Sequence, residues 1–457
     1  MCLLLIVRDE ESNLKANLPL WRDVAHCYVI GVDDRTTDGT MQAIHEALDE
    51  DTPRFVFRFT FENFSQARNT VLSSTWQSFP QASHILIADA DWRPTLATVD
   101  LSELDFHHRS FHFLVWDHTG HTTRLVGWLL RRDERLRFKY RVHETLDRSA
   151  ADTEPGKLLG WEVRVVESDS SWHAALHGHS RTAERFLFDL ELLELDYADD
   201  PTDLHTLFYL GITTYAYMET LIGKGTHGRT AELEALISSG VFYFQQAVDL
   251  YGETGNLDYV WSSIRWLAYG YHYFMGDTQE AERLYLQCID YDPSRVDCIV
   301  FLSRVHLNSG NLAAAWVQAK EGLIHQSTQY RPVDYFYIYE CFAPIQAATV
   351  ISKRIMTGSI GGDSLEGLLT LGVYLIRHHR DHCKHGVLVD TPEDIDNLES
   401  WFTAAARQEG VDVAETKYRN LQIDEVSLLK VLLSKWGTGR KAVEYTKRVS
   451  SSVQEHP

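Results

Sequence analysis

The first 175 residues alternate short apolar runs with amphipathic segments, and this alternation limits the possible folds more than any other feature. The apolar runs are strand-sized and rich in β-branched and aromatic residues, and they cover 2–7, 27–32, 54–59, 84–89 and 111–116. Helix-like segments lie between the early runs, at 11–21, 38–48 and 64–76. Strands that are apolar throughout and alternate with helices predict a mostly parallel sheet covered on both faces.

The pattern changes after Trp116. The following residues predict a hairpin around Thr119 and Gly120, and 137–146 and 161–168 look like further strands, which we expect to be antiparallel. These strands would complete an α/β domain with a mixed sheet.

From about residue 178 the pattern is helical, and part of it repeats. Three pairs of positions fall 34 residues apart, namely Gly276 with Gly310, Ala281 with Ala315, and Cys288 with Gly322. This period is that of tetratricopeptide repeats, in which small residues stand where antiparallel helices approach closely. The alternative is an irregular helical bundle. Segments 207–217 and 240–251 resemble another pair of repeat helices, separated by an insertion.

Composition excludes several classes of function. With 65 acidic and 43 basic side chains, the formal net charge is -22, which makes nucleic acid an unlikely partner. The six cysteines show no zinc spacing, so we expect reduced, buried thiols, no disulfides and a cytoplasmic location. No apolar run approaches the roughly 18–20 residues that a membrane span needs, and the first residues show no signal peptide.

Acidic residues follow the predicted strands. Asp89 and Asp91 end the strand at 84–89, Asp33 ends the strand at 27–32, and Arg8 and Glu10 follow the first strand. Ligands of parallel sheets bind at the carboxyl ends of the strands. Two carboxylates spaced i, i+2 at that edge can hold a divalent cation, although solvated loop carboxylates are the simpler interpretation.

Two further segments lie near predicted helix starts. Asp38 is placed to cap the helix that begins near Met41. Arg68 and Asn69 lie early in the helix at 64–76, where a guanidinium can reach a nucleotide phosphate or orient an acidic loop. A surface salt bridge is the alternative for Arg68.

Five motifs in this order resemble those of family-two-type glycosyltransferases of the A fold that carry a tetratricopeptide extension. They are Ile6–Glu11, Val32–Thr40, Phe64–Asn69, Ala88–Trp92 and Val142–Glu144. The sequence departs from the family pattern at Asp34-Arg35, where Thr-Gly is usual, and at Trp92, which replaces an acidic residue. Trp92 would either stack on a sugar or pack in the core.

The resemblance implies a nucleotide-sugar-binding domain and a role for each edge residue. Asp33 would bind the nucleoside, with Arg8 and Glu10 bordering its pocket. Asp89 would contact ribose or metal, and Asp91 would be the main carboxylate ligand of Mn²⁺ or Mg²⁺. Such a cation neutralises the diphosphate that leaves the sugar.

The resemblance also implies an inverting reaction, which needs one base to deprotonate the acceptor. Glu144 is the first choice for this base, and His143 would contact metal, phosphate or acceptor. On a regular strand these neighbours would face opposite ways. His173 resembles a histidine that several enzymes of this fold bring to the metal from a loop near the end of the domain, and His177 and His179 are the alternatives for that role.

These interpretations combine into one hypothesis. We expect a catalytic domain at 1–177, helical repeats at 178–328, further helices at 329–435 and a frayed tail at 436–457. The chain would transfer a sugar from a nucleotide-sugar, most simply a UDP-sugar, to a protein, peptide or glycan acceptor. The repeats would recognise the acceptor or form a homodimer. The alternative is a non-catalytic interaction scaffold with a degenerate nucleotide-binding domain.

Overall fold

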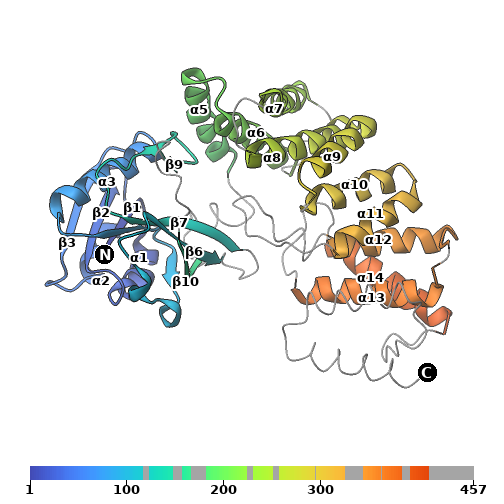
Figure 1. Ribbon diagram of the computed structural model, residues 1–457, viewed down its shortest axis with the longest axis horizontal. Helices are drawn as coiled ribbons and strands as arrows, with labels where there is room; N and C mark the ends of the chain where they lie inside the picture. Colours follow the sequence, from blue (N-terminus) through green and yellow to red (C-terminus); the bar gives the residue numbers. More distant parts are fainter. Residues whose placement is uncertain are drawn as a thin grey trace. The chain divides into compact units, whose positions relative to one another are not determined.

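The computed structural model contains two compact units, residues 1–259 and residues 260–457. It describes residues 1–116, 123–147, 157–165, 182–223, 230–250, 257–293, 295–324, 343–361, 363–382 and 392–410. The predicted hairpin turn at Thr119 and Gly120, the histidines at 173, 177 and 179, and the tail at 436–457 lie outside these ranges. The first unit holds the sheet, the helices that cover it and a further group of helices, and the described part of the second unit is helical (Figure 1).

An eight-stranded mixed sheet forms the centre of the first unit, with the strand order β3-β2-β1-β4-β7-β6-β10-β5. Its strands are β1 Cys2–Val7, β2 Cys27–Asp33, β3 Arg54–Phe59, β4 His84–Ile87, β5 Trp92–Pro94, β6 Ser110–Trp116, β7 Thr123–Arg131 and β10 Lys157–Val165. The strands predicted from apolar runs are confirmed, and the sheet and its helices give the expected α/β class.

Strands β3, β2, β1 and β4 are parallel (Figure 1), and β2, β1 and β4 are buried on both faces, whereas the edge strand β3 is partly exposed. Side chains alternate along β1, so that Leu3 and Leu5 pack with helices α1 (Glu11–Asn17) and α2 (Thr40–Ala47). Leu4 instead packs with helix α3 (Phe64–Ser78) on the other face. This two-sided burial explains why the strand sequence is apolar throughout.

The other half of the sheet differs in two respects from the prediction. Strand β7 is antiparallel to β4 and β6, as expected, but β10 runs parallel to β6 and antiparallel only to β5. The segment 137–146 is not one strand. It forms two short strands, β8 (Phe138–Lys139) and β9 (Thr145–Leu146), because Tyr140 and His143 adopt positive φ angles of 70° and 54° that reverse the chain.

Three helices complete the first unit: α5 (Ala183–Asp199), α6 (Leu204–Gly223) and α7 (Ala231–Asp249). Helices α5 and α7 both pack against α6. Helix α6 contains the predicted segment 207–217, and α7 contains most of 240–251. The expected insertion between these segments is shorter than predicted, since most of it extends the two helices.

Helices α6 and α7 cross at Gly240. An alanine Cβ at this position would lie 2.1 Å from Cε1 of Tyr215, whose side chain is buried. We therefore expect Gly240→Ala to lower the free energy of unfolding by about 1–3 kcal/mol, although alanine favours helices by up to about 1 kcal/mol. Urea denaturation measures the change. Gly160→Ala is the control, because its Cβ would meet only Glu103 at 3.8 Å. Equal stability of the two variants would contradict this packing.

The second unit is built from consecutive helices that pack on one another in sequence. They are α8 Leu257–Tyr269 (which begins in the first unit), a π-helical turn Gly270–Met275, α9 Thr278–Tyr291, α10 Asp297–Asn308, α11 Leu312–Ile324, α12 Ala343–Met356, α13 Leu365–His382 and α14 Pro392–Gln408. No helix in the described ranges is long and apolar enough to cross a membrane.

The 34-residue period is present in this geometry. Gly276 follows the π-helical turn at the end of α8 and Gly310 follows α10, with φ angles of 71° and 76°, which favour glycine. The next residues, Asp277 and Asn311, each accept a hydrogen bond from a backbone N–H three residues later. Ala281 and Ala315 are fully buried. The region is therefore a tetratricopeptide-like helical repeat.

The expectation of free thiols is wrong for one pair of cysteines. Cys288 on α9 and Cys298 on α10 form a disulfide, with their Cα atoms 6.2 Å apart. The turn between the two helices brings these residues together, which their spacing in sequence did not indicate. Cys2 and Cys27 are free and buried on the paired strands β1 and β2. Cys341 and Cys383 lie outside the described ranges.

Candidate nucleotide and metal site

The strand order reverses beside β1, which lies between β2 and β4. The chain runs outward from β1 to β3 and then returns to the other side of β1, so the connections diverge at the carboxyl ends of β1 and β4. Such a switch point is the usual ligand crevice of an open α/β sheet. Asp33 is the last residue of β2, and Arg8 and Asp89 follow the ends of β1 and β4 at this edge.

Arg68 connects two acidic residues at this edge. Its Nε donates to Oε1 of Glu144 at 2.5 Å, and its terminal nitrogen donates to Oδ1 of Asp89 at 3.2 Å. The guanidinium also lies 4.4 Å from the ring centroid of Trp128, which is within cation–π range. We call Arg68, Asp89 and Glu144 the arginine bridge. It joins helix α3, the loop after β4 and the turn before β9.

Burial sets the electrostatics of the arginine bridge. The Arg68 side chain is 6% exposed and that of Glu144 is 9% exposed. Burial alone would lower the pKa of Arg68, but the charges of Glu144 and Asp89 outweigh it and raise that pKa. Arg68 is thus a buried ion-pair partner that orients an acidic loop, and not a surface salt bridge.

The two D-x-D carboxylates lie in different environments. The Asp89 side chain is 36% exposed, whereas Asp91 is 1% exposed. Asp89 is therefore the carboxylate that a ligand in solvent reaches first. The neighbouring Trp92 is fully buried and stacks on Trp128, with ring centroids 5.8 Å apart. Trp92 thus packs in the core and does not face a sugar.

Asp33 at the end of β2 is held by Arg35. The two carboxylate oxygens accept hydrogen bonds from the Arg35 backbone N–H at 2.9 Å, from its Nε at 3.0 Å and 3.1 Å, and from its terminal nitrogen at 2.6 Å. Burial raises the pKa of Asp33, but the bonds from Arg35 outweigh burial and keep it below its ordinary value. Arg35 also lies over the ring of Phe61 at 5.0 Å.

The loops after β1 and β2 are tied together by acidic side chains. Asp9, with a positive φ of 53°, accepts a hydrogen bond from the Thr37 N–H at 2.7 Å. Glu10 accepts one from the Asn13 side chain at 2.7 Å, and its own N–H donates to the Thr40 hydroxyl. These bonds fix the loop next to Arg8, whose positive charge also lowers the pKa of Asp33.

The predicted helix cap needs a correction. Helix α2 begins at Thr40 with Gly39 as its N-cap, so Asp38 lies one residue before the cap. Its carboxylate still accepts the Thr40 N–H at 3.0 Å, and it also accepts the Glu11 N–H at 3.1 Å. Asp38 thus connects the first turns of α1 and α2.

His143 does not join the arginine bridge. Its positive φ turns the side chain toward helix α6, where the ring stacks on Tyr209 with centroids 4.0 Å apart. The next residue, Glu144, reaches Arg68 instead. The two neighbours therefore lie in different surroundings, although they do not lie on a regular strand.

No group of three or more histidine, cysteine or acidic side chains in the described ranges is arranged as a metal site. His173, the third predicted ligand, falls outside those ranges. Asp89 and Asp91 offer hard oxygen donors, which suit Mg²⁺ and Mn²⁺. Magnesium commonly takes only one or two carboxylates from the protein and the rest of its ligands from phosphate and water.

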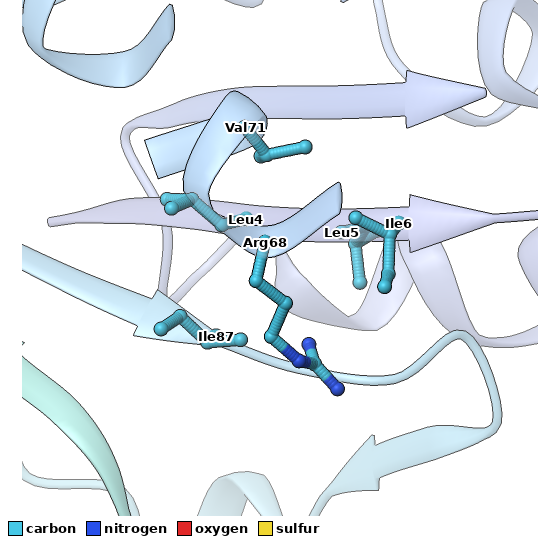
Figure 2. Close-up of a pocket in the computed structure, with 6 residues that line it drawn as sticks. All are labelled: Leu4, Leu5, Ile6, Arg68, Val71 and Ile87. Carbon is cyan, nitrogen blue, oxygen red and sulfur yellow. The ribbon is translucent and has the colours of Figure 1, made fainter. Parts of the chain in front are cut away.

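A small cavity of about 10 Å³ lies beneath Arg68, between helix α3 and the sheet. Its lining is aliphatic apart from the arginine and consists of Leu4, Leu5, Ile6, Arg68, Val71 and Ile87. Figure 2 shows the Arg68 side chain leaving the helix and passing these residues toward its charged end. The cavity is too small for a nucleotide, so it is not itself a binding site. Its aliphatic lining contacts the stem of the arginine side chain.

Two site residues were not assigned a role from the sequence. Arg35 stood out only as a departure from a family pattern, and nothing indicated that it would bind Asp33. Trp128 gave no signal, because contact between a strand residue and a helix arginine depends on sheet order. Arg35 binds Asp33 directly, and Trp128 packs on Arg68, which in turn binds Asp89 and Glu144.

No protein-family model matches the chain, and no curated protein matches it. Among solved structures, it is similar to the C-terminal part of a TPR repeat-containing protein from Cytophaga hutchinsonii, with 12% identity and a TM-score of 0.25. That match covers 58% of this chain and 98% of the other. A tetratricopeptide repeat protein from Parabacteroides merdae matches with 12% identity and a TM-score of 0.26, over 58% and 93% of the two chains.

A buried histidine on α6 predicts a pH dependence of stability. Burial lowers the pKa of His205 from 6.5 to about 4. Between these values the unfolded chain binds a proton that the folded chain does not, so stability falls as pH drops from about 6.5 to about 4. We expect His205 to account for roughly 2–3 kcal/mol of loss between pH 7 and pH 4.5. Urea denaturation at pH 7 and at pH 4.5 measures this loss, which should be smaller in His205→Gln than in the wild type. An equal loss of stability in the two proteins would contradict the assignment to His205.

Proposed function

We propose that the chain is a metal-dependent, inverting glycosyltransferase that uses a nucleotide-sugar, most simply a UDP-sugar. The observation that carries this proposal is the arginine bridge, which holds Asp89 and Glu144 together at the switch point of the sheet. The exposed carboxylate of Asp89 and the buried carboxylate of Glu144 then lie at the same edge of the sheet as the loops that follow β1 and β2. A nucleotide-sugar needs both a charged cradle for its diphosphate and a base beside its sugar.

The donor would bind across the ends of β1, β2 and β4. Asp89 and Asp91 would hold Mn²⁺ or Mg²⁺, which neutralises the diphosphate when it leaves. Asp33 and Arg35 would border the nucleoside, with Arg8 and Glu10 on the adjacent loop. Because Asp33 is already bonded to Arg35, the nucleoside would contact their ion pair rather than an isolated carboxylate.

Glu144 would act as the base. Arg68 Nε donates to its Oε1 at 2.5 Å and so orients the carboxylate, which would accept a proton from an acceptor hydroxyl. Proton transfer from that oxygen to Glu144 makes the hydroxyl a better nucleophile as it attacks the sugar from the face opposite the diphosphate. Arg68 would remain in place and keep Glu144 oriented.

The helical repeats would present the acceptor. Stacked helical hairpins form extended surfaces that suit a polypeptide or a glycan chain. The non-catalytic alternative shares this surface, so only the donor site separates the two functions.

A donor screen by thermal shift tests the proposal. UDP-glucose, UDP-N-acetylglucosamine and UDP-galactose are each added at 1 mM with and without Mn²⁺. A donor at about 100 times its dissociation constant stabilises the fold by about 2.7 kcal/mol, which raises the melting temperature by several degrees. Stabilisation that requires Mn²⁺ supports the proposal. No stabilisation by any donor favours the scaffold alternative.

A further inference from the structure

We propose that helix α6 positions Glu144, with His205 and Tyr209 as positioning residues for the base. This inference rests on the proposed function for its catalytic meaning, but its structural part is independent of catalysis. The segment concerned is residues 140–144, which we call the base turn. It lies between the short strands β8 and β9.

The base turn has an unfavourable backbone conformation. Tyr140 and His143 have φ angles of 70° and 54°, in the left-handed region that residues with a Cβ rarely adopt. Such residues persist when their surroundings fix them, and they often occur at functional sites. The turn therefore needs contacts from outside itself to keep its shape.

Helix α6 supplies those contacts at both unfavourable residues. The Nε2–H of His205 donates to the carbonyl oxygen of His143 at 2.9 Å, and Tyr209 stacks on the His143 ring. His205 also stacks on Tyr140, with ring centroids 3.7 Å apart and planes 8° apart. The Tyr140 hydroxyl donates to Asp203 at 2.9 Å, immediately before the helix.

Neighbouring elements hold the middle of the turn. The Arg141 N–H donates to Asp196 of helix α5 at 2.9 Å, and its guanidinium donates to the same carboxylate at 2.6 Å. The Arg141 carbonyl accepts the N–H of Phe64 at 2.9 Å, at the start of α3. Every residue from Tyr140 to His143 is thus attached to a helix or packed against one. Glu144 follows directly and meets Arg68.

The Glu144 side chain and its backbone are therefore held by different elements of the fold. Arg68 binds the Glu144 carboxylate, while α6 fixes the backbone that delivers it. The first helices after the sheet then belong to the catalytic site and are not merely a separate binding module. Residues 183–223 would be required for the base to act.

Amide hydrogen exchange on the full chain tests the structural part. His205→Ala should raise exchange within residues 140–146 by about tenfold, because the bond to His143 is lost, and α7 should be unchanged. His205→Gln keeps a donor near the position of Nε2 and should restore most of the protection. Met218→Ala is the matched control, since it shortens a fully buried side chain of α6 that lies far along the helix from His205.

The outcomes are distinct. Faster exchange confined to the base turn in His205→Ala, with rescue by glutamine, supports the proposal. Unchanged exchange in the base turn would overturn it, and so would failure of glutamine to restore protection. An equal effect of Met218→Ala would also overturn it, because the histidine would then act only through general stability.

A second pair of variants tests the backbone argument. In His143→Gly, glycine adopts a positive φ without steric cost, whereas the Cβ of alanine in His143→Ala disfavours it. Glycine should therefore keep more protection at 144–146 than alanine, although both remove the ring. Equal exchange in the two variants would contradict a role for the backbone conformation.

Turnover separates this inference from the proposed function. UDP release in Mn²⁺, measured with whichever of the three donors the wild-type chain turns over, should show a lower kcat for His205→Ala with little change in KM, and glutamine should restore kcat. A wild-type chain that turns over none of the three donors would count against the proposed function while leaving the exchange result intact. Full kcat in His205→Ala, together with altered exchange, would reject the positioning role.

Discussion

Replacing Arg68 with methionine should lower the free energy of unfolding by about 3–5 kcal/mol. The arginine is buried between Asp89 and Glu144, and methionine would leave the Glu144 carboxylate without its cationic partner. A buried charge that loses its partner keeps its desolvation cost without the compensating attraction. Urea denaturation at pH 7 measures this loss.

Two further variants separate charge from shape at this position. Arg68→Lys keeps the charge but cannot donate from a rigid fork to two carboxylates, so we expect about half the loss. The double variant Arg68→Met with Glu144→Gln removes both charges and should be more stable than Arg68→Met alone. A loss below about 1 kcal/mol for Arg68→Met, or no recovery in the double variant, would contradict the arginine bridge as a buried ion pair.

Asp89→Ala should remove the metal-dependent part of UDP binding, with a loss of affinity on the order of 100-fold in Mn²⁺, or about 2.7 kcal/mol. Asp89 is the exposed carboxylate of the D-x-D motif, and hard cations require such oxygen ligands. Asp91→Ala should have a similar effect, because we propose Asp91 as the second carboxylate ligand of the cation. Isothermal titration with UDP measures both variants.

The control for these variants lies on the same edge of the sheet. Asp34 follows Asp33, and its carboxylate accepts a hydrogen bond from the Thr60 hydroxyl at 2.9 Å. Asp34→Ala should change the affinity for UDP by less than about threefold, which is below 1 kcal/mol. Chelation with EDTA should weaken binding to the wild type and to Asp34→Ala, but not to Asp89→Ala. Unchanged UDP affinity of Asp91→Ala in Mn²⁺ would remove that residue from the metal site.

The sheet was predictable because its central strands β1, β2 and β4 are buried on both faces. Leu3, Leu4 and Leu5 are apolar in sequence since successive side chains meet helices on opposite sides of β1. The edge that collects Asp33 and Asp89 follows directly, because parallel strands bring their carboxyl ends together. The parallel direction of β10 could not be read, since direction depends on the connection and not on the strand sequence.

The candidate site was predictable in its residue types but not in its pairing. The sequence indicated that Arg68 would reach either a phosphate or an acidic loop, and the fold brings it to Asp89 and Glu144. A spacing of 76 positions between Arg68 and Glu144 gives no local signal for an ion pair. Positive φ at His143 was equally hidden, because nothing in the residue type requires it.

The period of 34 residues was visible because it places small residues at fixed structural positions. Glycine is favoured where a helix ends with positive φ, as at Gly276 and Gly310, and alanine is favoured where helices touch. The disulfide between Cys288 and Cys298 could not be predicted from the sequence. Its formation depends on how two helices turn against each other, which a count of cysteines does not describe.

Release of UDP from nucleotide-sugars tests the central claim most directly. Wild-type chain is incubated with UDP-glucose, UDP-N-acetylglucosamine or UDP-galactose, with Mn²⁺ or with EDTA, and free UDP is measured over time. We predict release from at least one donor that requires Mn²⁺ and that falls by about 100-fold or more in Glu144→Gln, since a positioned base contributes about 100-fold to 10,000-fold. No release from any donor, together with no Mn²⁺-dependent binding of UDP, would contradict a glycosyltransferase site in this chain.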